Sequence, residues 1–216
     1  MKQGAICDMD GLMFDTEQMY QACWNEIAGE MGITLGEHFT REISGSNGDL
    51  LRSIVRKYYH TDDPDALFQE VVRRTEVRLR TAVPVKPGLV ELLEFLKEKG
   101  VRLAVASSSY LRMIESNLNV SGTRKYFDQV VSGTSIGRGK PDPDIFLYAA
   151  EQLNLDPKDC YVLEDSINGV LAGLAAGCET IMVPDCAEPN ETIRSSRAHI
   201  YRSLLEVKED MEQGRL

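Results

Sequence analysis

Two acidic residues, Asp8 and Asp10, stand two positions apart at the end of a short apolar run, residues 4–7. If this run is a strand, both carboxyl groups point to the same side where it ends. One carboxylate of such a pair can attack an electrophile while the other passes a proton to the leaving group. The spacing alone is more typical of a solvated turn, so its interpretation depends on the rest of the chain.

Further polar residues follow three later apolar runs. They are Ser107 and Ser108 after residues 101–106, Lys140 after residues 129–131, and Glu164 with Asp165 after residues 161–163. Ligands of open parallel sheets bind beyond the carboxyl ends of the strands, so these side chains would share one edge. Each residue alone is typical of a turn, a helix cap or a surface charge. Their joint order favours a catalytic site.

This set of side chains suits phosphoryl transfer. A carboxylate that approaches a phosphate dianion needs a metal ion and cationic or hydrogen-bonding partners to offset charge repulsion. Carboxylate oxygens from Asp8 and Asp165, with Glu164 nearby, are ligands that Mg²⁺ prefers. Lys140 can neutralise charge, and the Ser107 hydroxyl can bind a phosphate oxygen. Backbone N–H groups after Ser107, where Ser108 stands, can complete the phosphate site.

The elements that position these residues follow from the periodicity. From about residue 84 onward, short apolar runs alternate with helical patterns, which is typical of βαβ units. Asp142 and Pro143 can cap and start one of these helices, and Ser166 can cap another that ends at Gly177. Residues 14–83 show helical patterns at 16–31, 47–59 and 64–80 instead. We therefore predict an α/β fold: a doubly wound, mostly parallel, Rossmann-like sheet core from residues 1–13 and 84–216, with a helical cap domain inserted at 14–83.

Composition excludes several classes of protein. The 216 residues are 43% hydrophobic, and no apolar stretch approaches the roughly 20 residues of a membrane span. Five cysteines form an odd number without close pairing, and we expect a cytoplasmic protein without disulfides. The net charge of −10 argues against nucleic-acid binding. An anionic substrate would therefore need a local positive site.

The motifs together carry a family resemblance. They are Asp8-Met9-Asp10-Gly11, Ser107, Gly139-Lys140-Pro141-Asp142 and Glu164-Asp165-Ser166-x-x-Gly169. In this order they resemble the four motifs of the haloacid dehalogenase superfamily, and the insertion resembles the C1-type cap of its beta-phosphoglucomutase and sugar-phosphatase branch. The resemblance implies that Asp8 is the nucleophile, forming an aspartyl-phosphate, and that Asp10 is general acid and then base. It also implies Mg²⁺ bound by Asp8, the Asp10 main-chain carbonyl and Asp165, with Glu164 as a further ligand.

Departures from the family pattern narrow the function. In beta-phosphoglucomutases the cap contributes a histidine and a basic residue, where this chain has Tyr20 and Gly48. We therefore expect a magnesium-dependent phosphatase for a small phosphomonoester, a sugar phosphate or a nucleoside monophosphate, with Tyr20 and Asn47 as substrate contacts. Dehalogenation is disfavoured because that branch lacks the second aspartate. A phosphosugar mutase and a catalytically silent phosphometabolite-binding protein are the alternatives. We expect a monomer or weak homodimer.

Overall fold

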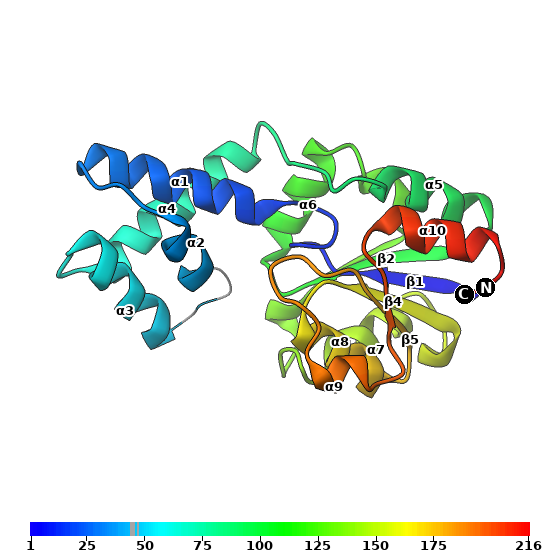
Figure 1. Ribbon diagram of the computed structural model, residues 1–216. Helices are drawn as coiled ribbons and strands as arrows, with labels where there is room; N and C mark the ends of the chain where they lie inside the picture. Colours follow the sequence, from blue (N-terminus) through cyan, green and yellow to red (C-terminus); the bar gives the residue numbers. More distant parts are fainter. Residues whose placement is uncertain (44–45, 47) are drawn as a thin grey trace. The chain divides into compact units, whose positions relative to one another are not determined.

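The computed structural model describes residues 1–43, 46 and 48–216. The chain forms two compact units, one from Met1–Asp15 with Pro84–Leu216 and one from Thr16–Val83 (Figure 1). We call them the sheet unit and the helical unit. The division falls after Asp15, two residues later than the boundary expected from the sequence.

The sheet unit is built on parallel strands. In the part of the chain that the structure describes, six strands form one sheet in the order β3-β2-β1-β4-β5-β6. Their bounds are β1 (Gly4–Cys7), β2 (Arg102–Ser107), β3 (Gln129–Ser132), β4 (Cys160–Glu164), β5 (Glu179–Met182) and β6 (His199–Ile200). Strand β1 pairs with β2 and β4, so that Cys7 lies opposite Val105 and Leu163. Because β1 is central and buried on both faces, its sequence is continuously apolar.

Helices cover both faces of this sheet. They are α5 (Leu89–Glu98), α6 (Leu111–Val120), α7 (Asp144–Gln152), α8 (Ile167–Ala176), α9 (Glu191–Arg194) and α10 (Leu204–Glu212), with short 3₁₀ turns η1 (Arg124–Tyr126), η2 (Gly133–Ser135) and η3 (Pro157–Asp159). Figure 1 shows α5 and α10 over one face and α7 and α8 over the other. On the second face, Ile6 of β1 packs in one apolar cluster with Phe146 and Ala172. The predicted doubly wound α/β fold is confirmed.

The helix ends follow the sequence signals in part. Ser166 caps α8 by accepting a hydrogen bond from the N–H of Gly169, and Gly177 ends the helix with φ +83°. The expectation that Asp142 caps α7 is wrong. Pro143 occupies that position, and the Asp142 carboxylate lies 3.2 Å from Arg138 instead.

The helical unit has its own core. It contains α1 (Thr16–Glu30), α2 (Glu37–Ile43), α3 (Gly48–Tyr59) and α4 (Pro64–Leu79). The ring of Trp24 packs against those of Phe39 and Tyr59, each with centroids 5.6 Å apart, and the Tyr59 hydroxyl donates to the Trp24 carbonyl at 2.6 Å. Helix α2, of seven residues, was too short to be recognised from its periodicity. These aromatic rings belong to a buried cluster formed within the helical unit.

The chain leaves and re-enters the sheet unit at one place, which we call the stem. Its two segments are residues 13–15 and 84–86. The N–H of Asp15 donates to the Pro84 carbonyl and that of Lys86 to the Met13 carbonyl, both at 2.9 Å, and Phe14 forms a β-bridge with Val85. The two pieces of the sheet unit that flank the inserted segment are therefore hydrogen-bonded to each other.

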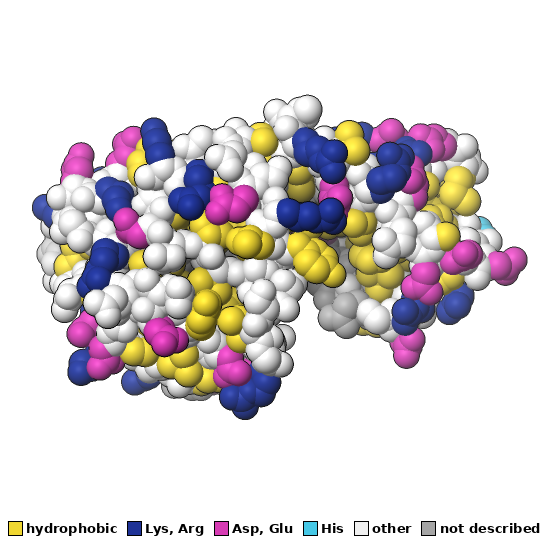
Figure 2. Space-filling model, turned by 180° about the vertical axis from the view of Figure 1, so that it is seen from behind, with side chains coloured by type: hydrophobic (Ala, Val, Ile, Leu, Met, Phe, Trp, Pro, Cys, Tyr) yellow, Lys and Arg dark blue, Asp and Glu magenta, His cyan; other side chains and the backbone are white. Residues whose placement is uncertain are grey.

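The surface carries mixed charge. On the face drawn in Figure 2, basic and acidic side chains alternate over the described residues, without a continuous basic stripe. None of the helices described is both long enough and apolar enough to cross a membrane.

Candidate active site

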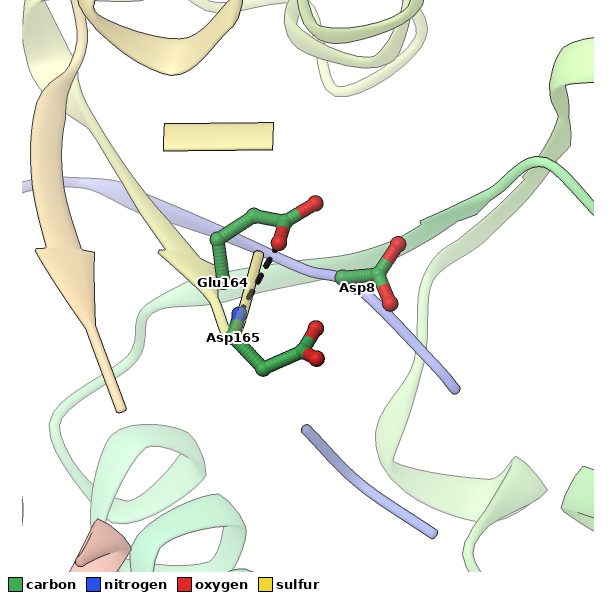
Figure 3. Close-up of side chains that lie close together, drawn as sticks. All are labelled: Asp8, Glu164 and Asp165. Carbon is green, nitrogen blue, oxygen red and sulfur yellow. Dashed lines mark hydrogen bonds between the residues drawn. The ribbon is translucent and has the colours of Figure 1, made fainter. Parts of the chain in front are cut away.

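Three carboxyl groups meet where β1 and β4 end. Asp8 directly follows β1, Glu164 is the last residue of β4, and Asp165 follows it. One oxygen from each lies within 4.8 Å of the other two, and Figure 3 shows the groups facing a common space. The N–H of Asp8 donates to the Leu163 carbonyl at 3.0 Å, which continues the ladder to β4 beyond the strand. The sheet therefore fixes the backbone that carries these groups.

Lys140 brings a positive charge into this cluster from the loop after β3. Its ammonium group donates to Glu164 Oε1 at 2.6 Å and also to Asp8 Oδ1, and its side chain is only 9% exposed. The other Glu164 oxygen, Oε2, accepts from the N–H groups of Asp165 and Ser166 at 2.9 and 2.8 Å and from the Ser166 hydroxyl at 2.9 Å. In the structure Glu164 thus orients the lysine, and both of its oxygens are hydrogen-bonded.

The cluster carries excess negative charge. Burial raises the pKa of Asp8 to about 7; Lys140 opposes this shift, and Glu164 and Asp10 add to it. Burial and the charges of Glu164 and Asp8 raise the pKa of Asp165 to about 9. For Lys140, burial lowers the pKa, but the charges of Asp8 and Glu164 outweigh burial and raise it. One lysine does not balance three carboxyl groups, so the hard oxygen donors of this site fit a divalent cation such as Mg²⁺.

Two glycines allow the carboxyl groups to approach the backbone. A Cβ atom on Gly11, whose φ is +87°, would lie 2.3 Å from Asp165 Oδ2. A Cβ atom on Gly169, in the first turn of α8, would lie 1.7 Å from Glu164 Oε1. Both distances are shorter than real contacts, so a side chain at either position would displace a carboxylate of the cluster.

Asp10 lies beside the end of β2. Its Oδ2 accepts hydrogen bonds from the Ser109 hydroxyl at 2.9 Å and from the Ser107 hydroxyl at 3.4 Å. No sequence motif singles out Ser109. The run of three serines was visible, but which hydroxyl faces Asp10 depends on the turn after β2. Ser108 is exposed and lines an open cavity of about 220 Å³ together with Lys140 and Thr134.

The remaining predicted site residues lie in or near the helical unit. Tyr20, on α1, lines a cavity of about 160 Å³ with Glu17, Trp24, Ile43, Ser46, Leu51 and Phe68. Asn47 lies outside the described residues. Each unit therefore contains a small cavity lined by at least one residue predicted to bind substrate.

This chain is similar to known proteins in sequence and in fold. Residues 5–183 match the model of the haloacid dehalogenase-like hydrolases. The chain is 34% identical over 180 residues to a phosphorylated carbohydrates phosphatase of Thermotoga maritima, covering 83% of each protein. It is 33% identical over 185 residues to hexitol phosphatase B of Escherichia coli K12, covering 83% of this chain and 82% of that protein. Among solved structures, a HAD family hydrolase from Deinococcus radiodurans with bound phosphate and sodium superposes with a TM-score of 0.84 at 25% identity, covering 99% of this chain and 96% of that chain.

Proposed function

Because the chain belongs to the haloacid dehalogenase-like hydrolases, we propose that it is a magnesium-dependent phosphatase that cleaves a small phosphomonoester through a phosphoaspartate on Asp8. Relatives named as phosphatases, at 33–34% identity over most of the chain, support the reaction class. The observation that carries the residue assignment is the buried contact of Lys140 with Asp8 and Glu164, beside Asp165.

The residues divide the reaction into two displacements. In the first, a carboxylate oxygen of Asp8 attacks phosphorus, the bond to the alcohol oxygen breaks, and Asp10 donates a proton to that oxygen. In the second, Asp10 takes a proton from water, the water oxygen attacks phosphorus, and the bond to Asp8 breaks. The products are the free alcohol and inorganic phosphate, and both aspartates return to their starting state.

Charge on the phosphate is offset from two sides. Ser107 ends β2, which lies beside β1, and Lys140 reaches Asp8 from the loop after β3. The Ser107 hydroxyl and the Lys140 ammonium group can both donate to phosphate oxygens. Mg²⁺, when bound by Asp8, Asp165 and the main-chain carbonyl of Asp10, would supply positive charge beside the phosphate oxygens. Burial first, and then the neighbouring carboxylates, raise the pKa values of Asp8 and Asp165, and a bound cation would favour the ionised form of both groups.

The helical unit is proposed as a cap that selects the alcohol. Its cavity is lined by one carboxylate, Glu17, by the hydroxyls of Tyr20 and Ser46, and by apolar side chains; no cationic side chain is among the described lining residues. Such a lining suits an uncharged alcohol with hydroxyl groups, such as a sugar or a polyol. Asn47 is proposed as a further contact. Opening and closing of a cap would admit substrate and exclude bulk water.

The test measures inorganic phosphate released from a panel of sugar, polyol and nucleoside monophosphates in the presence of Mg²⁺. We expect release with at least one sugar or polyol phosphate and background rates for Asp8→Asn. Asp62→Asn, which removes an exposed carboxylate of the helical unit, should keep the wild-type rate.

Two results would contradict the proposal. Conversion of glucose 1-phosphate to glucose 6-phosphate without phosphate release would identify a mutase. Binding of a phosphorylated metabolite without turnover, and without a phosphoenzyme, would identify a silent binding protein.

A further inference from the structure

The Asp10 carboxylate is held asymmetrically. Both neighbouring hydroxyls, those of Ser109 at 2.9 Å and Ser107 at 3.4 Å, donate to the same oxygen, Oδ2, and Oδ1 takes part in neither bond. The two oxygens of a carboxyl group are chemically equivalent until the surroundings distinguish them. An oxygen that already accepts hydrogen bonds is the less favourable place for an added proton.

Ser109 is itself fixed by its neighbours. Its N–H donates to the Ser107 hydroxyl oxygen at 3.0 Å, and its carbonyl accepts from the hydroxyl of Ser132 at 2.7 Å. Ser132 ends β3 and is buried, and its hydroxyl also lies 2.8 Å from that of Thr134. Because the Ser107 oxygen accepts from Ser109, the Ser107 hydroxyl hydrogen is free to point at Asp10. Three hydrogen bonds therefore fix Ser109 in the turn after β2: one from its N–H, one to its carbonyl and one from its hydroxyl.

We propose that Ser109 is a positioning residue that keeps Asp10 Oδ2 as an acceptor, so that the transferable proton resides on Oδ1. This inference rests on the proposed function, in which Asp10 is the acid and base. In the first displacement the alcohol oxygen takes the proton from Oδ1 as its bond to phosphorus breaks. In the second, Oδ1 takes a proton from the attacking water. Ser109 contacts neither phosphate nor metal in this scheme.

The dependence of the rate on the leaving group tests the proposal. Alkyl monophosphates need a proton on the departing oxygen, whereas p-nitrophenolate leaves without one near neutral pH, so only the first class depends on a well-placed acid. For Ser109→Ala we expect kcat/KM for an alkyl monophosphate to fall by about tenfold to a hundredfold. The value for p-nitrophenyl phosphate should change by less than about threefold. Ser109→Thr, which keeps the hydroxyl, should restore most of the loss.

The controls separate this role from others. Ser195→Ala removes the hydroxyl of an exposed serine at the end of α9 and should leave both substrates unaffected. Equal losses on both substrates, or a rise in KM with unchanged kcat, would show that Ser109 binds phosphate or supports the fold, and would overturn the proposal. Unchanged rates in Ser109→Ala would also overturn it. A wild-type protein that releases phosphate from no monophosphate of the panel would overturn the proposed function and this inference with it.

Discussion

Lys140 is the residue on which the charge balance of the cluster depends. Its ammonium group contacts Asp8 and Glu164 where water is largely excluded, so the three side chains form a buried ionic unit. Removing one partner of such a unit costs more than the intact unit contributes, because the remaining charges stay buried without compensation. The lysine should therefore matter for folding as well as for chemistry.

We predict that Lys140→Met lowers the free energy of unfolding by about 3 kcal/mol near pH 8, measured by urea denaturation. Adding Glu164→Gln should recover part of the loss, because one uncompensated carboxylate is then gone. Lys158→Met, at an exposed lysine that pairs with Asp156, should leave the urea midpoint nearly unchanged. A Lys140→Met protein as stable as wild type would contradict a buried ionic unit.

For single residues, the sequence predicted which ones come together at the site better than it predicted which side chains contact each other. Asp8, Lys140 and Asp165 could be selected because each follows a separate apolar run, and parallel topology brings such positions to one edge. The sequence could not predict that Glu164 contacts Lys140 or that Ser109 faces Asp10. Both contacts depend on side-chain rotamers and on the backbone conformation after the strands. Adjacent serines have the same composition signal, but only the structure distinguishes which hydroxyl faces the site.

At the scale of elements, the junction of β4 and α8 holds Glu164 in place. The strand ends at Glu164, Ser166 caps the helix, and Gly169 leaves room for the carboxylate. The sequence predicted this strand and this cap because an apolar run, a serine and a closing glycine occur in order. It missed β6 and α2, which have two and seven residues, because so few residues give no measurable period.

We predict that Gly169→Ala displaces the Glu164 carboxylate, lowers phosphatase kcat/KM by at least about tenfold, and destabilises the sheet unit by about 1–3 kcal/mol. Phosphate release and urea denaturation measure the two effects. Gly29→Ala is the matched control: it lies on an exposed helix face with nothing within 4 Å of the added atom, and should keep full activity. Wild-type kinetics in Gly169→Ala would show that the position of Glu164 is not critical.

At the scale of the whole molecule, the carboxyl cluster couples stability to pH. The pKa values of Asp8 and Asp165, about 7 and about 9, lie above the ordinary value of 3.8. The folded protein therefore binds protons more tightly than the unfolded chain between about pH 4 and pH 9. The stabilising contribution is complete below this range and is lost as the pH rises through it.

We predict that in EDTA the melting temperature falls from about pH 5 to about pH 8, and that Mg²⁺ raises it more at the higher pH, where Asp8 is largely ionised and fewer protons must leave when the metal binds. Differential scanning calorimetry in both buffers measures this. Asp165→Asn should weaken the pH dependence of the melting temperature and reduce its increase with Mg²⁺. This variant distinguishes the effect of the carboxyl cluster from the effect of the net charge of −10. A melting temperature that rises over this pH range in EDTA would contradict the raised pKa values of Asp8 and Asp165.

The stem allows the inserted segment to change without changing the sheet. Residues 13–15 and 84–86 are hydrogen-bonded to each other within the sheet unit, so the gap between them is short whatever segment bridges it. Another inserted segment, or a tight turn, could join the same two ends without altering a strand of the sheet. Substrate specificity and phosphate chemistry could then evolve separately. The same catalytic residues at the edge of the sheet could act on phosphate esters of different alcohols when one continuous stretch of sequence is exchanged.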